Sequence, residues 1–259
     1  MKLASWNVNS VRMRLERLLA FLERHRPDVV CLQELKVETA GFPADVIRAA
    51  GYHAVVHGQK TYNGVAILSR EEPQDKLIGF DDGEDDPQAR LVAATVGGVR
   101  ILSAYAPNGS EVGSEKWAYK IAWYARLARY LRERLDPGQP AALSGDLNVA
   151  PEERDVHDPA TWAETVLFHP QARALLASIA DWGLVDTFRL HDTSGGKFTW
   201  WDYRMGAFHR NWGVRIDFIL ATNVLARQCV SATIDRDERK GTQPSDHAPI
   251  LSTFELASG

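Results

Sequence analysis

The chain has few of the features that mark secreted, disulfide-bonded or membrane-spanning proteins. Its 259 residues include two cysteines, Cys31 and Cys229, which are too few for a disulfide framework or a thiolate metal site. No apolar run approaches the length of about 20 residues that a membrane helix needs. The first residues also lack the apolar segment and cleavage site of a secretory signal. We therefore expect a cytoplasmic protein that does not interact with a membrane.

The chain also lacks the excess of positive charge carried by proteins that coat DNA. Its formal net charge is −4, and the sequence DDGEDD concentrates acidity at residues 81–86. Basic residues recur in the segment 116–134, where they could contact nucleic acid, although such charges more often only solvate the outer face of a helix. These basic residues are Lys116, Lys120, Arg126, Arg129, Arg132 and Arg134.

No linker, low-complexity tract or fixed-period repeat divides the chain, so we expect one domain over residues 1–259. The loop-rich stretch 150–162 comes nearest to a boundary, and we interpret it as an insertion near the functional site. The hydrophobic fraction of 45% and the charged fraction of 25% are those of an ordinary globular protein.

The apolar patterning predicts strands and helices in alternation. Gly97-Gly98 separates two strand-like segments and is typical of a hairpin turn. Because strands that are apolar throughout need cover on both faces, we expect a four-layer α/β sandwich, with two packed mixed, largely antiparallel β-sheets flanked by helices. The expected strands are residues 2–6, 28–33, 52–56, 64–69, 90–96, 99–105, 141–145, 197–201, 215–222, 228–234 and 249–255. Helical spacing relates Leu15, Leu18, Leu19 and Leu22, and likewise Trp117, Ile121, Tyr124, Ala128, Leu131 and Leu135.

Polar residues interrupt or follow several of these strand-like segments. Carboxylates and carboxamides at the ends of buried strands reduce stability unless a metal or a substrate uses them, so we expect the clusters to form one site. Asp217 and His247 lie in two such segments, and a carboxylate that holds the Nδ1 proton of an imidazole fixes its tautomer and raises its basicity. An Asp-His pair of this kind indicates catalysis.

Oxygen donors from a few strand ends suit Mg²⁺, and Glu34, Asn7 and Asp246 are the candidates. The histidines lack the spacing of a zinc site. Asp146 and Asn148 are two residues apart, so on an extended chain both face one ligand, the acid accepting a proton from water and the amide orienting that water or a phosphoryl oxygen. Alone, this pair favours the simpler interpretation of a turn capped by both side chains.

The whole ordered set of motifs resembles the exonuclease III family of DNA-repair nucleases, within the endonuclease/exonuclease/phosphatase fold. The resemblance extends over essentially the whole chain, and its specificity lies in the order of the motifs. They are SWNVNS, DVVCLQELK, YNGVAILS, YAPNG, SGDLNVAP, WGLVDTFR, FTWWDYR, RIDFIL and SDHAPI.

The resemblance implies a role for each matching residue. By this resemblance, Glu34 would be the principal ligand of Mg²⁺, or of Mn²⁺ in its place, with Asn7 and Asp246 beside it. Asp217 would orient His247, and His247 would bind or protonate the scissile phosphate. The resemblance further implies that Asp146 is the general base and that Asn148 positions water and phosphate. It implies that the phenol of Tyr105 stabilises charge or takes part in proton transfer. Lys36 and Asn108 would support the phosphate and the metal ligands.

We expect aromatic and apolar residues in the C-terminal half of the chain to select the substrate. Trp200, Arg204 and Trp212 could enclose a flipped-out sugar, although any single tryptophan more often packs between sheets. By resemblance, Trp200 joins Val214 and Ile216 in an apolar pocket for a baseless deoxyribose. His157 stands where some relatives have a residue as small as glycine; it either hinders entry of a flipped nucleotide and favours 3′ ends, or is an exposed loop residue.

The expected function is therefore that of a monomeric, Mg²⁺-dependent DNA-repair phosphodiesterase acting on double-stranded DNA. It would cut 5′ to abasic sites and remove blocked or ordinary 3′ ends. One alternative is another hydrolase of the same fold, acting on inositol phosphates or sphingomyelin. A second is a DNA-binding protein whose site has decayed, which the complete set of polar residues disfavours.

Overall fold

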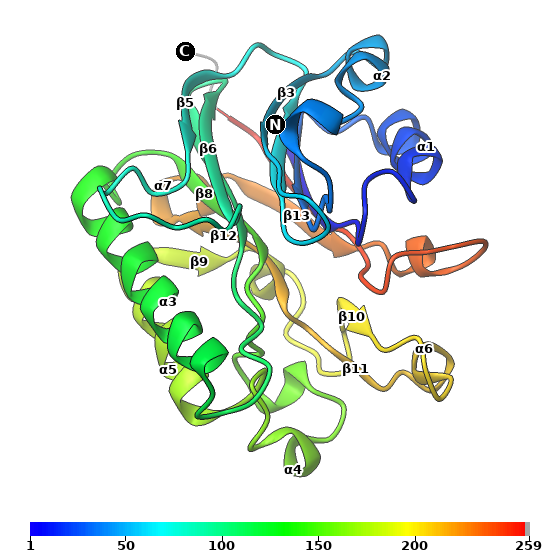
Figure 1. Ribbon diagram of the computed structural model, residues 1–259, viewed down its shortest axis with the longest axis vertical. Helices are drawn as coiled ribbons and strands as arrows, with labels where there is room; N and C mark the ends of the chain where they lie inside the picture. The colour runs from blue at the N-terminus through cyan, green and yellow to red at the C-terminus, as the bar shows by residue number, and fades with distance from the viewer. Residues whose placement is uncertain (257–259) are drawn as a thin grey trace.

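The computed structural model describes residues 1–256 and contains two six-stranded sheets packed face to face (Figure 1). In spatial order, the first sheet consists of β13 (Cys229–Ile234), β14 (Ile250–Phe254), β1 (Lys2–Asn7), β2 (Val29–Gln33), β4 (Val65–Ser69) and β3 (His53–His57). The second consists of β5 (Gln74–Ile78), β6 (Leu91–Val96), β7 (Val99–Tyr105), β8 (Ala141–Asp146), β12 (Asp217–Thr222) and β9 (Leu184–Asp186). A separate two-stranded ribbon pairs β10 (Trp200–Trp201) with β11 (Gly213–Val214).

Helices cover the outer face of each sheet, which confirms the predicted four layers. The first sheet carries α1 (Leu15–His25) and α2 (Ala44–Ala49), and the second carries α3 (Glu115–Arg134) and α5 (Pro170–Ala180) (Figure 1). The shorter helices are α4 (Pro159–Trp162), α6 (Ala207–Arg210) and α7 (Asn223–Ala226), with 3-10 turns η1 (Thr39–Gly41), η2 (Glu153–Asp155), η3 (Phe188–Leu190) and η4 (Arg236–Arg239). Among the described residues, no helix combines the length and the apolar character that crossing a bilayer requires.

Strand register brings the ends of several strands to one edge. β1 runs parallel to β2 and β7 runs parallel to β8, whereas the other neighbouring strands in both sheets are antiparallel. Asp146 at the end of β8 is the Cα partner of Tyr105 on one side and of Asp217 on the other. In the first sheet, Asn7 pairs with Gln33. The residues that follow these strand ends therefore share one edge of the sandwich.

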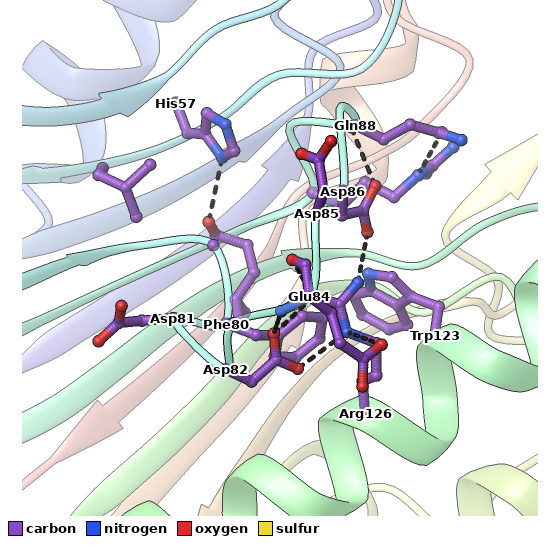
Figure 2. Close-up of a pocket in the computed structure, with 15 residues that line it drawn as sticks. His57, Phe80, Asp81, Asp82, Glu84, Asp85, Asp86, Gln88, Trp123 and Arg126 are labelled. Atoms are coloured by element: carbon purple, nitrogen blue, oxygen red, sulfur yellow. Dashed lines mark hydrogen bonds and ion pairs between the residues drawn. The ribbon is translucent and has the colours of Figure 1, made fainter.

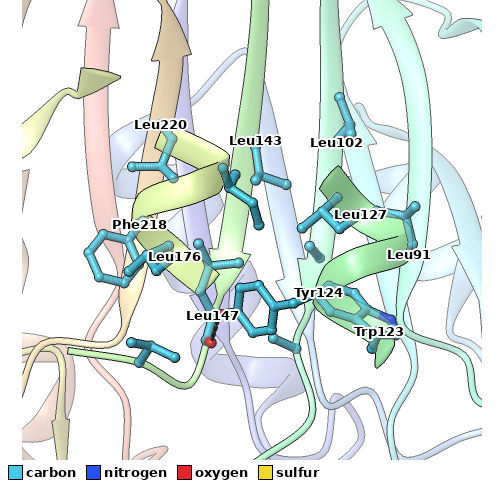
Figure 3. Packing of buried hydrophobic residues seen from close by; sticks show 14 of the residues in the cluster. Leu91, Leu102, Trp123, Tyr124, Leu127, Leu143, Leu147, Leu176, Phe218 and Leu220 are labelled. Carbon is cyan, nitrogen blue, oxygen red and sulfur yellow. Dashed lines mark hydrogen bonds between the residues drawn. The ribbon is translucent and has the colours of Figure 1, made fainter. Parts of the chain in front are cut away.

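Helices α3 and α5 pack against the outer face of the second sheet, whose strands end at this edge. Figure 3 shows Tyr124 and Leu127 of α3 and Leu176 of α5 facing Leu143 and Phe218 of the sheet. The buried face of α3 differs from the predicted one, because Lys120 and Trp123 point inward while Ile121 and Ala128 are only partly buried. Burying one such large apolar side chain contributes about 1.5–3 kcal/mol.

Gly145 shows why β8 needs a glycine beside its terminal acid. A Cβ atom at this position would lie 1.9 Å from the carbonyl oxygen of Ala104 on the neighbouring strand. No side chain fits there, because even Cβ contacts under 3.0 Å essentially never occur in proteins. The SGDLN motif therefore requires Gly145 for close packing of β7 against β8.

Several elements differ from the sequence prediction. β5 was not predicted because its sequence, QDKLI, is largely polar and the strand lies exposed at the edge of the sheet. The three residues of β9 are too few to show a pattern. The predicted strand 215–222 begins at Asp217, since the preceding residues Gly213–Val214 pair with β10 in the separate ribbon.

The acidic segment 81–86 and the basic face of α3 neutralise each other (Figure 2). Arg126 donates hydrogen bonds of 2.9–3.0 Å to both oxygens of Asp82, and another of 2.9 Å to Asp86. Arg129 binds the same Asp82 at 3.0 Å. Lys120 is fully buried as well, so these three residues do not form a free basic surface for nucleic acid. The adjoining pocket of about 350 Å³ contains none of the predicted site residues.

Candidate functional site

Polar side chains from three distant segments converge at the shared strand edge. Glu34 follows β2, Asp146 ends β8 and His247 precedes β14. Each of these residues offers a metal-binding atom within 4.8 Å of the other two. The structure thus brings together an acid from the first sheet, an acid from the second and the imidazole near the C-terminus.

Asp217 and His247 form a buried pair beside Asp146. Oδ2 of Asp217 lies 2.8 Å from Nδ1 of His247, which leaves Nε2 of the same ring 3.7 Å from Oδ2 of Asp146. Thr199 accepts the backbone N–H of Asp217 at 3.1 Å, which fixes the start of β12. Oδ1 of Asp217 has no hydrogen-bond partner among residues 1–256.

The buried charges change the acidity of both groups. Burial alone would lower the pKa of His247, but the carboxylates of Asp217 and Asp146 outweigh it and raise that pKa to about 10. Burial, together with the negative charge of Asp217, raises the pKa of Asp146 well above its usual range. Three carboxylates, including Glu34, are thus crowded around one imidazole, and this excess of negative charge suits a bound cation.

Asp146 and Asn148 lie in the turn after β8, where Asp146 both caps the turn and faces the candidate site. Oδ1 of Asp146 accepts the backbone N–H of Asn148 at 3.0 Å, so the acid caps the turn. Its other oxygen, Oδ2, accepts a hydrogen bond of 2.9 Å from Asn7. The prediction that both residues project from an extended chain is wrong, because Asn148 has a left-handed backbone with φ of 51°. A turn, rather than strand alternation, brings the amide to the acid.

The predicted metal ligands differ in how they face the cluster. Glu34 and Asp146 supply the oxygen donors that hard divalent cations prefer. Nδ2 of Asn7 donates to Glu34 at 2.8 Å and to Asp146 at 2.9 Å, so the nitrogen of this carboxamide, and not its oxygen, faces the acids. Asp246 accepts hydrogen bonds from Asn9 at 2.8 Å and from Trp200 at 3.0 Å. The donor set fits a divalent cation, with the ligand roles of Asn7 and Asp246 still predictions.

Two residues with strained backbone follow β2 at the same edge. Glu34 and Lys36 have φ values of 51° and 53°, a region that residues other than glycine seldom occupy. Backbone bonds from Leu35 and Lys36 to the carbonyls of Gly64 and Asn63 hold this strained segment in place. The Glu34 carboxylate lies on the side of Asp146 at the end of β8, since Nδ2 of Asn7 donates hydrogen bonds to both acids.

Asn9 is a bridge that sequence reasoning did not assign. Its side chain accepts a hydrogen bond of 2.5 Å from Lys36 and donates one of 2.8 Å to Asp246. Lys36 in turn forms an ion pair of 3.0 Å with Glu34. The signal was present in the sequence, because Asn9 lies two residues after Asn7 in the polar interruption that follows the first strand.

Tyr105 and Asn108 line the side of the site next to β7. Burial, with the negative charges of Glu34 and Asp146, raises the pKa of the Tyr105 phenol well above its usual value. The guanidinium of Arg90 lies 4.8 Å from the centroid of the Tyr105 ring. A cavity of about 450 Å³ contains Tyr105, Asn108 and Arg90 in its lining.

His157 and Trp212 line a larger groove of about 790 Å³ formed by the 154–161 loop and the segment 210–212. Their rings stack with centroids 6.1 Å apart and planes at 19°. Nε1 of Trp162 lies 3.2 Å from Nδ1 of His157, so the imidazole is held by its neighbours. The interpretation of His157 as a freely exposed loop residue does not fit this half-buried, stacked position.

The predicted apolar pocket residues belong to one buried cluster. Val214 and Ile216 are 0% and 2% exposed and pack with Ala150, Val156 and Phe168. The half-buried Trp200 lies against this cluster. Arg204 lies apart from it, on an exposed loop where it pairs with Asp202. Trp201 is fully buried, as the interpretation of tryptophans as packing residues expects.

Comparison with known proteins places the chain in a family. A model of the endonuclease/exonuclease/phosphatase family matches residues 4–247. Exodeoxyribonuclease III of Haemophilus influenzae is 38% identical over 98% of this chain and 100% of its own length. An AP endonuclease from Archaeoglobus fulgidus has a similar structure (TM-score 0.96, 41% identity, 99% of this chain and 100% of that one). So does the 3′-5′ exonuclease NExo from Neisseria meningitidis (TM-score 0.96, 40% identity, the same coverage). The chain belongs to the exonuclease III family of hydrolytic nucleases, within the endonuclease/exonuclease/phosphatase family.

Proposed function

We propose that this protein is a DNA-repair phosphodiesterase that uses Mg²⁺, or Mn²⁺ in its place, to hydrolyse double-stranded DNA at 3′ ends and 5′ to abasic sites. The observation that carries the proposal is the meeting of Glu34, Asp146 and His247 within 4.8 Å, with Asp217 holding the imidazole. Relatives named as an exodeoxyribonuclease, an AP endonuclease and a 3′ phosphatase support a DNA substrate.

The residues have distinct roles in the proposed reaction. Asp146 accepts a proton from the attacking water, and its raised pKa suits a general base. Asn148 orients that water and the phosphate. His247, kept protonated by Asp217, donates to a nonbridging oxygen on which negative charge grows. Tyr105, whose phenol stays neutral because burial raises its pKa, supplies a further hydrogen-bond donor.

The cation would be held by Glu34, with Asn7 and Asp246 nearby, and would supply positive charge to the phosphoryl group. Asn9 and Lys36 hold the carboxylates of Asp246 and Glu34 in place. Asn108 binds the phosphate together with Asn148, to which it donates a hydrogen bond of 3.2 Å.

The groove with His157 and Trp212 is the proposed place of the nucleotide next to the scissile bond. A baseless deoxyribose would enter against Trp200, beside the buried Val214 and Ile216. His157, held by Trp162 and Trp212, lines this groove next to Val156, which packs with Val214 and Ile216, and in this proposal its ring narrows the approach to that cluster. We therefore propose that removal of 3′ ends exceeds incision at abasic sites, and that Arg204 and Trp212 contact the duplex.

One experiment separates this function from the two alternatives. The purified protein is given an abasic duplex, a duplex with a 3′-phosphate, a recessed 3′ end, inositol phosphates and sphingomyelin, each with Mg²⁺, Mn²⁺ or chelator. We expect metal-dependent release from the DNA substrates alone. Cleavage of the small esters would favour another hydrolase of the fold, and DNA binding without cleavage would favour a decayed site.

We also propose that the protein is a monomer with a single domain and that it works in the cytoplasm. Light scattering at the concentration of the assay tests the first part, since a stable dimer would have twice the chain mass of 28.9 kDa.

A further inference from the structure

Lys120 of α3 is a fully buried cation whose ammonium is bound entirely by peptide groups. Its Nζ donates hydrogen bonds to the carbonyl oxygens of Asn108 at 3.1 Å, Asn148 at 2.8 Å and Val166 at 2.7 Å. Three acceptors match the three hydrogens of an ammonium, whereas a neutral amine has two hydrogens and would leave one carbonyl unpaired. Burial lowers the pKa of Lys120 to about 7, and the negative charge of Asp146 acts against that shift.

The three carbonyls belong to three separate loops. Asn108 lies between β7 and α3, Asn148 follows β8, and Val166 precedes α5. A buried charge is expensive unless it is fully hydrogen-bonded, so each of these carbonyls is held strongly in its place. One side chain therefore fixes three loops relative to one another.

Two of these loops carry carboxamides of the candidate site. Nδ2 of Asn108 donates to Oδ1 of Asn148 at 3.2 Å, and Nδ2 of Asn148 donates to the carbonyl oxygen of Ala106 at 2.9 Å. The left-handed backbone of Asn148 needs external support, and its carbonyl is the one that Lys120 holds at 2.8 Å. Lys120 thus holds the backbone of both residues that carry these carboxamides.

The stem of Lys120 is also closely confined. A Cβ atom at Gly109 would lie 3.1 Å from Cδ of Lys120 and 3.1 Å from the ring of Trp117. The ammonium lies 5.5 Å from the centroid of that ring. The side chain therefore has little freedom to adjust if its ammonium loses a partner.

We propose that Lys120 is a positioning residue for phosphodiester hydrolysis. It acts through Asn148 and Asn108, because its ammonium binds the backbone carbonyls of both residues and so holds their two loops in place. The proposal rests on the roles proposed above for those carboxamides. A purely structural brace would stabilise the fold without changing turnover. A positioning residue changes kcat through Asn148.

The test is a double-mutant cycle between Lys120→Met and Asn148→Ala, with kcat and KM measured on a 3′-phosphate duplex in Mg²⁺ and unfolding followed in urea. Methionine keeps the length of the stem and removes the donors. We expect Lys120→Met to lower kcat about a hundredfold, because a displacement of about 1 Å has such an effect. On the Asn148→Ala background, the same change should lower kcat less than about threefold, since the residue through which it acts is gone.

Tyr52→Phe is the matched control for the loss of a buried side-chain bond to the backbone. Tyr52, between α2 and β3, donates a hydrogen bond to the carbonyl oxygen of Pro27 at 2.8 Å. Pro27 precedes β2, whereas the site residue Glu34 follows the opposite end of that strand. We expect it to lower stability and leave kcat unchanged. If Lys120→Met does not fold, the cycle is repeated with Lys120→Gln, whose amide retains two hydrogens and should give a smaller loss of kcat with the same non-additivity.

Equal loss of kcat by the lysine variant on both backgrounds, or unchanged kcat in the single variant, would overturn the proposal. Full turnover in Asn148→Ala, or no DNA cleavage by the parent, would instead contradict the proposed function from which it starts.

Discussion

Oδ2 of Asp217 lies 2.8 Å from Nδ1 of His247, at the point where the start of β12 meets the segment before β14. Both side chains are almost completely buried, at 0% and 4% exposure. The contact fixes which nitrogen of the ring faces Asp146 and keeps the imidazole protonated near neutral pH.

Replacing Asp217 by asparagine should therefore lower the pKa of His247. In the metal-free protein this pKa is raised to about 10, above the value of about 6.5 for an unperturbed histidine. A raised pKa means that the stabilisation from this pair is complete below pH ~6.5 and is lost as the pH rises toward the folded value. Ring NMR titration of the metal-free parent and Asp217→Asn measures the shift. A ring in the parent that titrates near 6.5 would contradict the account.

Metal binding should depend on Glu34. A ligand that binds the folded state raises the melting temperature, so Mg²⁺ or Mn²⁺ should stabilise the parent, and the stabilisation should rise with the logarithm of the metal concentration once the site is mostly occupied. Glu34→Gln should lose this stabilisation because it removes a charged oxygen donor from the group with Asp146 and His247. Glu72→Gln, at an exposed acid outside the site, is the control and should respond like the parent. Equal stabilisation of Glu34→Gln and the parent would exclude Glu34 as a ligand.

Substitution of His157 by glycine should increase incision at abasic sites. The ring stacks on Trp212 in the groove beside Val156, which packs with Val214 and Ile216, so we expect its removal to widen the approach to that cluster. We expect a gain of roughly tenfold or more in kcat/KM on an abasic duplex, with little change on a 3′-phosphate duplex. His191→Gly, at an exposed histidine elsewhere, should change neither rate. No gain in incision would remove the steric role of His157.

The acidic segment 81–86 should contribute to stability in a manner that depends on pH. Hydrogen bonds from Arg126 lower the pKa of Asp82 below its usual range. A lowered pKa gives stabilisation that is present above the unfolded value of about 3.9 and is lost as the pH falls through the folded one. Asp82→Asn should therefore be about 1 kcal/mol less stable than the parent at pH 7. Urea unfolding at pH 7 and near pH 2 should show this difference becoming smaller in acid; a constant difference would contradict the ion-pair explanation.

Much of the fold could be predicted because its signals are local. Apolar strand segments, the Gly97-Gly98 turn and helical spacing each depend on near neighbours, and they led to the four layers that the structure has. β5 and β9 escaped prediction for the opposite reason, since one is polar at an exposed edge and the other is three residues long.

The site was harder to predict where its geometry depends on tertiary contacts. Glu34 and His247 follow from motifs at strand ends, but their separation depends on how two sheets pack. Lys120 looked like a surface charge, because nothing in its helical neighbours shows that three loop carbonyls meet beneath it. The left-handed turn at Asn148 likewise depends on that buried support.

The central claim is that one metal-dependent site formed by Glu34, Asp146 and His247 hydrolyses DNA phosphodiesters. The most direct measurement is the single-turnover rate of 3′-phosphate release from a labelled duplex by the parent and by Asp146→Asn, with Mg²⁺ and with chelator. We expect release by the parent in Mg²⁺, none in chelator, and a loss of a hundredfold or more, to order of magnitude, in the variant, which should fold normally. Release at the parental rate by Asp146→Asn, or in the presence of chelator, would contradict the account.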